Sequence, residues 1–172
     1  CQDCLSLIDI SPNQYCPFCK PAKIVLAGRT CFFCKRTKNL DGLYSAASYQ
    51  NFIIKKVVAQ FKYEPYIKAL SKPLSTLIIK YLQLLEQQLN GAGTLLIPVP
   101  LTKKKLKQRG FNQSEEIAKE LTASFNIPLL CNILVKTKET PSQVELSGKE
   151  REENVRGVFF CKNPEMIKGQ KI

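Results

Sequence analysis

The chain has 172 residues, of which 44% are hydrophobic, and this content is enough for a folded core and excludes wholesale disorder. Lys and Arg number 26 against 14 Asp and Glu, so the formal net charge is +12 at pH 7. Such an excess favours phosphate-bearing partners, either nucleic acid or nucleotides, over a basic surface that is merely solvated. The sequence has no apolar run long enough to span a membrane and no histidine to serve as a metal ligand or base.

Six of the eight cysteines form three Cys-X-X-Cys pairs near the start of the chain. The pairs are Cys1 with Cys4, Cys16 with Cys19, and Cys31 with Cys34. Two such pairs complete a tetrahedral zinc site with four thiolates. A disulfide framework is typical of secreted chains, and nothing thioredoxin-like surrounds these pairs. The spacing therefore predicts a structural zinc ribbon over residues 1–40, in a protein of the reducing cytoplasm.

One zinc site uses two pairs, so one pair is left over. We expect the second and third pairs to form a closed site, and Cys1 and Cys4 to belong to a second site whose other half lies upstream of this sequence. A closed shell of four thiolates leaves no position for chemistry. Four thiolates and one Zn²⁺ would lower the formal net charge from +12 to about +10, so the basic excess survives.

Residues 41–172 alternate between patterns typical of strands and of helices. Residues 43–49 are predicted as a strand, and Asn51 is a candidate N-cap for the amphipathic helix that follows. A longer amphipathic helix is expected from about residue 70 to a C-cap and turn at 90–93.

The second half of the chain continues the alternation. Short buried strands are predicted at 94–100 and 127–135, and a further strand at 157–161. A helix from about residue 112 to 124 separates the first two. A short charged helix with Ser147 as N-cap precedes the third. This order predicts an α/β fold with a mostly parallel sheet. The two other cysteines, Cys131 and Cys161, stand in apolar contexts and are expected in the core.

A basic stretch, "PVPLTKKKLKQRGFNQ", joins the predicted strand at 94–100 to the next helix. Because ligands of open α/β sheets bind beyond the carboxyl ends of the strands, we expect a phosphate-binding loop there. Arg109 offers a bidentate guanidinium, Gly110 allows close backbone approach, and the helix start supplies free N–H groups. A solvated lysine loop is the alternative.

These motifs resemble the ComF family. "PVPLTKKKLKQRGFNQSEEIA" resembles its signature, and "TPSQVELSGKEREENVRGVF" resembles its second block. The Cys-X-X-Cys pairs resemble its double zinc ribbon, so the likeness covers nearly the whole chain in the right order. The family implies a type I phosphoribosyltransferase fold, and its members are linked to natural competence and DNA uptake.

The resemblance implies a phosphoribosyl pyrophosphate site, with Mg²⁺ accompanying the pyrophosphate. The residues expected to bind substrate or phosphate are Lys103, Lys105, Arg109, Gly110, Phe111, Asn112, Gln113 and Arg151. Lys105 stands where the family tends to have arginine. After "GQKI" the family continues into a strand, two aspartates and a Thr-Thr-Gly loop that holds the ribose 5-phosphate. We therefore expect the sheet to be truncated and catalysis to require a longer protein.

Two functions remain open on the sequence. The first is a phosphoribosyltransferase-type protein that binds phosphoribosyl pyrophosphate or a nucleotide, with a link to competence machinery proteins. The second is a zinc-ribbon accessory factor that binds single-stranded DNA without catalysis. Its stacking platform would be the aromatic residues Phe32, Phe33, Tyr44 and Tyr49.

Overall fold

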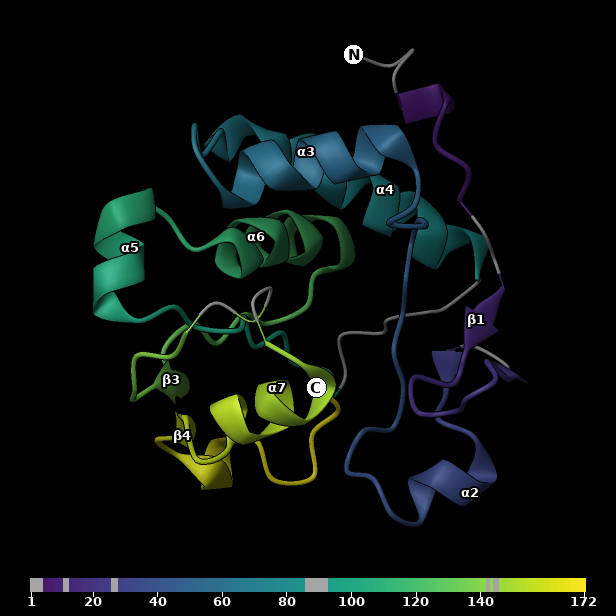
Figure 1. Cartoon of the computed structure of the whole chain (residues 1–172), viewed down its shortest axis with the longest axis vertical. Helices are drawn as coiled ribbons and strands as arrows, with labels where there is room; N and C mark the ends of the chain where they lie inside the picture. The colour runs from purple at the N-terminus through teal and green to yellow at the C-terminus, as the bar shows by residue number, and fades with distance from the viewer. Residues whose placement is uncertain (1–4, 11–12, 26–27, 86–92, 142, 144–145) are drawn as a thin grey trace.

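The computed structural model describes residues 5–10, 13–25, 28–85, 93–141, 143 and 146–172. Over these residues the protein is a mixed α/β structure, as predicted, in which helices predominate and the sheets are small. Figure 1 shows the helices α3, α4 and α6 lying together, with the four-cysteine ribbon to one side and the last helix and strands beyond α6. None of the described helices is both long enough and apolar enough to cross a bilayer.

The N-terminal ribbon is built from very short elements. The strands β1 (Gln14–Tyr15) and β2 (Ile24–Val25) pair antiparallel, and α2 (Phe32–Lys35) follows them. The chain leaving the ribbon returns to it, because Leu43 donates its N–H to the carbonyl of Gly28 at 2.8 Å. A Cβ atom at position 28 would lie 2.7 Å from the backbone carbonyl oxygen of Leu43, and φ of Gly28 is +65°. The close return of the chain therefore requires glycine at this position.

The predicted strand at 43–49 is wrong: the segment is irregular between Gly42 and α3. Leu43, Tyr44 and Tyr49 are exposed, so the apolar pattern that suggested a strand does not mark a buried face. The backbone N–H of Ser45 donates to the side-chain carbonyl of Gln14 at 3.2 Å instead of to a strand partner.

Two helices follow as predicted. Asn51 caps α3 (Phe52–Lys62), where its side chain accepts from the N–H groups of Ile53 and Ile54. The 3-10 turn η2 (Lys68–Leu70) leads into α4 (Ser71–Leu84). The predicted C-cap at 90–93 falls mainly on residues outside the described part of the chain.

The hydrophobic core lies between these helices and α6 (Gln113–Phe125), which packs mainly on α4. Phe61, Leu74 and Phe111 form its centre, and the rings of Phe61 and Phe111 lie 5.5 Å apart. A second cluster joins Ile8 of the N-terminal region to Ile54 and Leu77. Burial of this apolar surface, rather than sheet pairing, holds the described elements together.

The strand predictions of the second half are met only in part. The segment 94–100 makes two isolated parallel bridges, from Thr94 to Lys171 and from Leu96 to Leu129, and forms no assigned strand. Pro98 and Pro100 carry no N–H, so a continuous ladder cannot form there. A predominantly parallel sheet is not shown among the described residues.

The two remaining strands form a small antiparallel pair beyond α6 (Figure 1). The strands β3 (Leu134–Lys136) and β4 (Phe159–Cys161) pair antiparallel, with Val135 opposite Phe160. Between them lies α7 (Gly148–Val155), which begins after Ser147 as predicted. The short 3-10 turn η4 (Pro164–Met166) follows β4. Cys131 and Cys161 are only half-buried, so the expectation that both lie in the core is not met.

Candidate functional site

Four cysteine sulfurs gather at one point in the ribbon. The Sγ atoms of Cys16, Cys19, Cys31 and Cys34 all lie within 4.8 Å of one another. Those of Cys19 and Cys31 are 3.6 Å apart, and those of Cys19 and Cys34 are 3.7 Å apart. A tetrahedral zinc site with Zn–S bonds of about 2.3 Å has sulfur–sulfur edges of about 3.8 Å. The cluster therefore fits a zinc ion, and the predicted pairing of the second and third Cys-X-X-Cys motifs is confirmed as a candidate metal site.

Backbone hydrogen bonds hold the two knuckles in place. Cys16 follows β1 directly, and its N–H donates to the carbonyl of Lys23 at 2.9 Å. Cys31 precedes α2, and its carbonyl accepts from the N–H of Lys35 at 2.9 Å. The other expected metal ligands, Cys1 and Cys4, lie outside the described residues.

The cluster also separates the acidities of its thiols. The backbone N–H of Cys31 lowers the pKa of Cys16 to about 6, and the backbone N–H of Cys34 lowers the pKa of Cys31. Thiol hydrogen bonds with Cys31 raise the pKa of Cys19 to about 12 and also raise that of Cys34. Without metal, the cluster thus favours the thiolate at Cys16 and the thiol at Cys19, whereas zinc binding would deprotonate all four cysteines.

The basic stretch is a helix and not the predicted loop. Residues Lys103–Arg109 form α5, whose N-cap Thr102 accepts the N–H of Lys105 through its hydroxyl at 3.4 Å. Lysine and arginine are good helix formers, so once the ends are capped their repulsion does not prevent the helix. Gly110 ends the helix with φ at +77°, a conformation that favours glycine. The cations therefore lie on a short helix that is capped at both ends.

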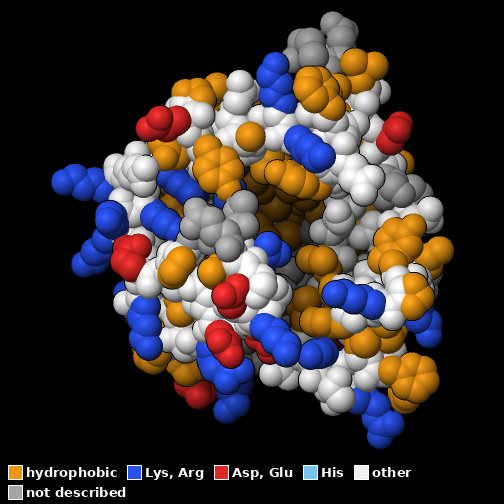
Figure 2. Space-filling model, viewed as in Figure 1, with side chains coloured by type: hydrophobic (Ala, Val, Ile, Leu, Met, Phe, Trp, Pro, Cys, Tyr) orange, Lys and Arg blue, Asp and Glu red, His pale blue; other side chains and the backbone are white. Residues whose placement is uncertain are grey.

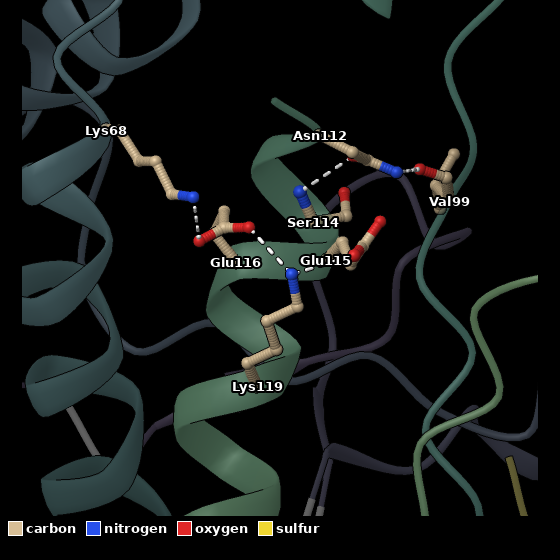
Figure 3. A network of polar contacts seen from close by, with 7 residues as sticks. All are labelled: Lys68, Val99, Asn112, Ser114, Glu115, Glu116 and Lys119. Atoms are coloured by element: carbon tan, nitrogen blue, oxygen red, sulfur yellow. Dashed lines mark hydrogen bonds and ion pairs between the residues drawn. The ribbon is translucent and has the colours of Figure 1, made fainter. Parts of the chain in front are cut away.

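Asn112 makes hydrogen bonds to the segments on both sides of α5. Its Oδ1 accepts the N–H of Ser114 at 3.1 Å and so caps α6, while its Nδ2 donates to the carbonyl of Val99 at 3.1 Å. Figure 3 shows Asn112 between these two partners. One side chain thus joins the segment before α5, at Val99, to the first turn of α6, at Ser114.

Ion pairs occupy the first turn of α6. Glu116 contacts the Nζ of Lys68 at 3.1 Å and that of Lys119 at 2.9 Å, and Glu115 pairs with Lys119 at 2.8 Å (Figure 3). Desolvation raises the pKa of Glu116, but the hydrogen bonds from Lys119 and Lys68 outweigh it, so the pKa lies below its ordinary value. Because these carboxylates have cationic partners of their own, they leave the cations of α5 unneutralised.

Gln113 positions Arg109. Its Oε1 accepts from Nη1 of Arg109 at 3.0 Å, and its Nε2 donates to the carbonyl of Phe61 at 3.1 Å. The neighbouring Phe111 is buried against Phe61. Of the sequence-predicted site residues, Phe111, Asn112 and Gln113 therefore build the junction between α5 and α6, and Arg109 is oriented by it.

The other predicted site residues differ in exposure. Lys103 and Gly110 are exposed, and Lys105 is half-buried. Arg151 lies on α7, and its Nε donates to the carbonyl of Gln143 at 2.7 Å. No ion pair joins Lys103, Lys105, Arg109 or Arg151 to a carboxylate within the described part of the chain.

Two further lysines near the basic segment were not predicted. Lys136 on β3 donates its Nζ to the hydroxyl of Thr140 at 2.7 Å, and desolvation followed by the charge of Lys105 lowers the pKa of Lys136. Lys62 ends α3 and lines the same cavity as Arg109. Nothing local in the sequence separates these lysines from the other cations, because their position depends on tertiary packing.

The cavity beside this junction has a volume of about 600 Å³. Its apolar wall comes from α3, α4, α6 and the segment that precedes α5, and includes Ile54, Val58, Leu77, Val99 and Ile117. Its polar end is formed by Lys62, Arg109, Asn112, Gln113 and Ser114. Figure 2 shows a hollow in the molecular surface whose inner walls are hydrophobic.

The described residues thus define a mixed α/β protein with a four-cysteine centre compatible with zinc. Part of the chain is similar to Competence protein F of Haemophilus influenzae, with 38% identity over 64 residues, which are 37% of this chain and 28% of that protein. The matched part thus spans well under two thirds of the curated relative. No protein-family model matches the chain, and no solved structure matches it. The resemblance predicted from the motifs is confirmed by this relative.

Proposed function

We propose that this chain is the phosphate-holding part of a ComF-like, phosphoribosyltransferase-type protein that acts in the cytoplasm during DNA uptake in natural competence. Its ligand would be phosphoribosyl pyrophosphate, with Mg²⁺ on the pyrophosphate, or a nucleotide. The observation that carries the proposal is the α5–α6 junction. There Arg109 is held by Gln113, and the cations of α5 have no carboxylate partner among the described residues.

The location of this junction supports the proposal. The helix α5 begins just beyond the segment whose Thr94 and Leu96 make parallel bridges on its two sides. A phosphate site beyond the carboxyl end of a segment with parallel pairing is typical of α/β proteins. The ribbon of residues 1–40 would then be a structural module beside the α/β domain of residues 41–172.

The electrostatics support an anion rather than a neutral ligand. Desolvation lowers the pKa of Lys136, and the charge of Lys105, which comes from a different element, lowers it further. Such a like-charge approach costs free energy that a bound phosphate would recover. In a transferase, the same cations would stabilise a departing pyrophosphate.

Isothermal titration calorimetry with phosphoribosyl pyrophosphate and Mg²⁺ tests this function. We expect Arg109→Met to weaken binding about tenfold or more, because a charge-assisted hydrogen bond contributes roughly 1.5–3 kcal/mol. Lys55→Met is the matched control, since Lys55 is an exposed cation of α3 and its loss changes the net charge equally. Absence of binding by the wild-type chain and by a longer form that contains it would refute the proposal.

A second candidate function, binding of single-stranded DNA, is favoured by the surface of α2. Phe32 and Phe33 are 72% and 73% exposed. The Nζ of Lys23 lies 5.6 Å from the ring centroid of Phe33, and the Cζ of Arg36 lies 5.8 Å from that of Phe32. Exposed rings flanked by cations suit stacking on bases next to a phosphate backbone.

Electrophoretic mobility shifts with single-stranded DNA over a salt series test this second function. We expect Phe32→Ala and Phe33→Ala each to weaken binding by roughly 1–3 kcal/mol. Phe52→Ala is the control, because Phe52 is equally exposed, at 73%, but lies on α3 outside the ribbon. An affinity that does not fall with salt, or that falls equally with Phe52→Ala, would exclude it.

A further inference from the structure

The cavity between α3, α4 and α6 has two chemically distinct ends. Its wall is mostly apolar, whereas Lys62 and Arg109 reach it from two different helices. No Asp or Glu occurs among its described lining residues. A volume of about 600 Å³ is within the range of small-molecule sites.

The two side-chain amides at the polar end, Asn112 and Gln113, already make hydrogen bonds within the protein. Both polar atoms of Asn112 are used by Ser114 and Val99, and both polar atoms of Gln113 are used by Arg109 and Phe61. Each amide therefore keeps one N–H and one acceptor lone pair, while its orientation is fixed by its protein partners. Lys62 and Arg109 keep their positive charges available for a ligand, since neither makes an ion pair with a described carboxylate.

We propose that this cavity binds a ring-bearing phosphate monoester, with the phosphate held by Arg109 and Lys62 and the ring packed against Ile54, Val58, Leu77 and Ile117. The inference deepens the proposed function and rests on it for the phosphate group. It adds that the ligand carries an apolar ring next to its phosphate. Because the ring's neighbours in the cavity are aliphatic, the ring is recognised chiefly by contact and shape.

The test compares phenyl phosphate with methyl phosphate, which share the charged group and differ in the ring. Chemical-shift titrations of the full chain would give both dissociation constants, including weak ones. We expect phenyl phosphate to bind at least about tenfold more tightly, because burial of an aromatic ring removes a large apolar area from water. Equal affinities would overturn the inference.

Three variants assign the two ends of the cavity. Lys62→Met and Arg109→Met should each weaken both phosphates about tenfold, while Lys55→Met should leave both unchanged. Ala46→Phe places a ring into the cavity from an irregular segment and should abolish the preference for phenyl phosphate while methyl phosphate still binds. A preference that survives Ala46→Phe would show that the ring binds elsewhere, and so would overturn the inference.

The same titrations separate this inference from the proposed function. Binding of phosphoribosyl pyrophosphate that depends on Arg109, together with equal affinities for the two phosphates, would retain the proposed function and overturn the ring-binding cavity. The opposite result, a ring preference without binding of phosphoribosyl pyrophosphate, would support the cavity as a site for ring-bearing phosphates and refute the proposed function.

Discussion

Gln113 connects a candidate ligand-binding group to the core through a single side chain. It holds Arg109 at one end and the carbonyl of Phe61 at the other. These residues are separated by 52 positions along the chain, counted from Phe61 to Gln113. The orientation of the guanidinium therefore depends on where the start of α6 lies relative to the end of α3.

We predict that Gln113→Leu lowers the free energy of unfolding by about 1–3 kcal/mol, because it leaves the carbonyl of Phe61 without its donor. It should also weaken phosphate binding through Arg109, although Gln113 itself carries no charge. Urea unfolding and calorimetry measure the two effects. Gln83→Leu, at an exposed position of α4, should change neither, and an unaltered stability of Gln113→Leu would contradict the prediction.

Local residue signals were the most predictable part of the molecule. Asn51 and Ser147 were recognised as N-caps because a capping side chain reaches N–H groups only two or three residues along the chain. The four clustered cysteines were recognised for the same reason, since their spacing encodes the knuckle. The relay from Arg109 to Phe61 and the positions of Lys62 and Lys136 were not predictable, because no local pattern records contacts between distant segments.

At the scale of elements, α6 is joined to η2 by the ion pair between Glu116 and Lys68. The side chain of Glu116 is 13% exposed, so this pair is screened less than one at the surface. Its lowered pKa has a direct consequence for stability. A carboxyl whose pKa is lower in the folded state stabilises the fold above its unfolded pKa and loses that contribution as the pH falls through the folded pKa.

We therefore predict that the wild type loses stability as the pH falls below about 4.5. At pH 7, Glu116→Gln should be less stable than the wild type by about 1–2 kcal/mol, and this difference should shrink in acid as Glu116 becomes protonated. Thermal unfolding from pH 7 to pH 3 measures both. Glu165→Gln should have little effect, since Glu165 pairs with Lys168 at 3.6 Å while 82% exposed. A pH-independent difference would contradict the assignment.

The elements differ in how well the sequence predicted them. Two helices with a regular apolar face, α3 and α6, were expected close to their observed bounds, because the periodicity reports burial directly. The start of α4 was also expected, but α4 ends at Leu84 and not near residue 90. The segments 43–49 and 94–100 were predicted as strands and form none. A strand requires a partner elsewhere in the chain, and the prolines of the second segment lack the N–H groups that pairing needs.

At the scale of the whole molecule, the ribbon and the helices depend on different interactions. The ribbon has few buried residues besides its cysteines, so metal binding would supply much of its stability. The helical part has its own core around Phe61, Leu74 and Phe111. Contact between them includes Ile8, which packs with Ile54 and Leu77.

We predict that Cys34→Ser lowers the zinc content by about one equivalent per chain, as measured by mass spectrometry of the metal. Limited proteolysis should then cut within residues 13–42, while far-UV circular dichroism retains most of its helical signal. Cys131→Ser should keep its zinc, because Cys131 lies outside the four-cysteine cluster. Full helical unfolding on metal loss would show that the two parts are a single cooperative unit.

The hydrogen bond between Asn112 and Val99 joins the segment that precedes α5 to the segment that follows it. The segments on either side of α5 are thus fixed to each other, and α5 itself donates side-chain hydrogen bonds from Gln108 to Tyr66 and from Arg109 to Gln113. The exposed lysines of α5 make neither of these contacts, so we expect their charges to be exchangeable without loss of the scaffold, provided that Thr102 and Gly110 still begin and end the helix. A designer could exchange this helix for one of another charge and so retarget the protein without redesigning its scaffold.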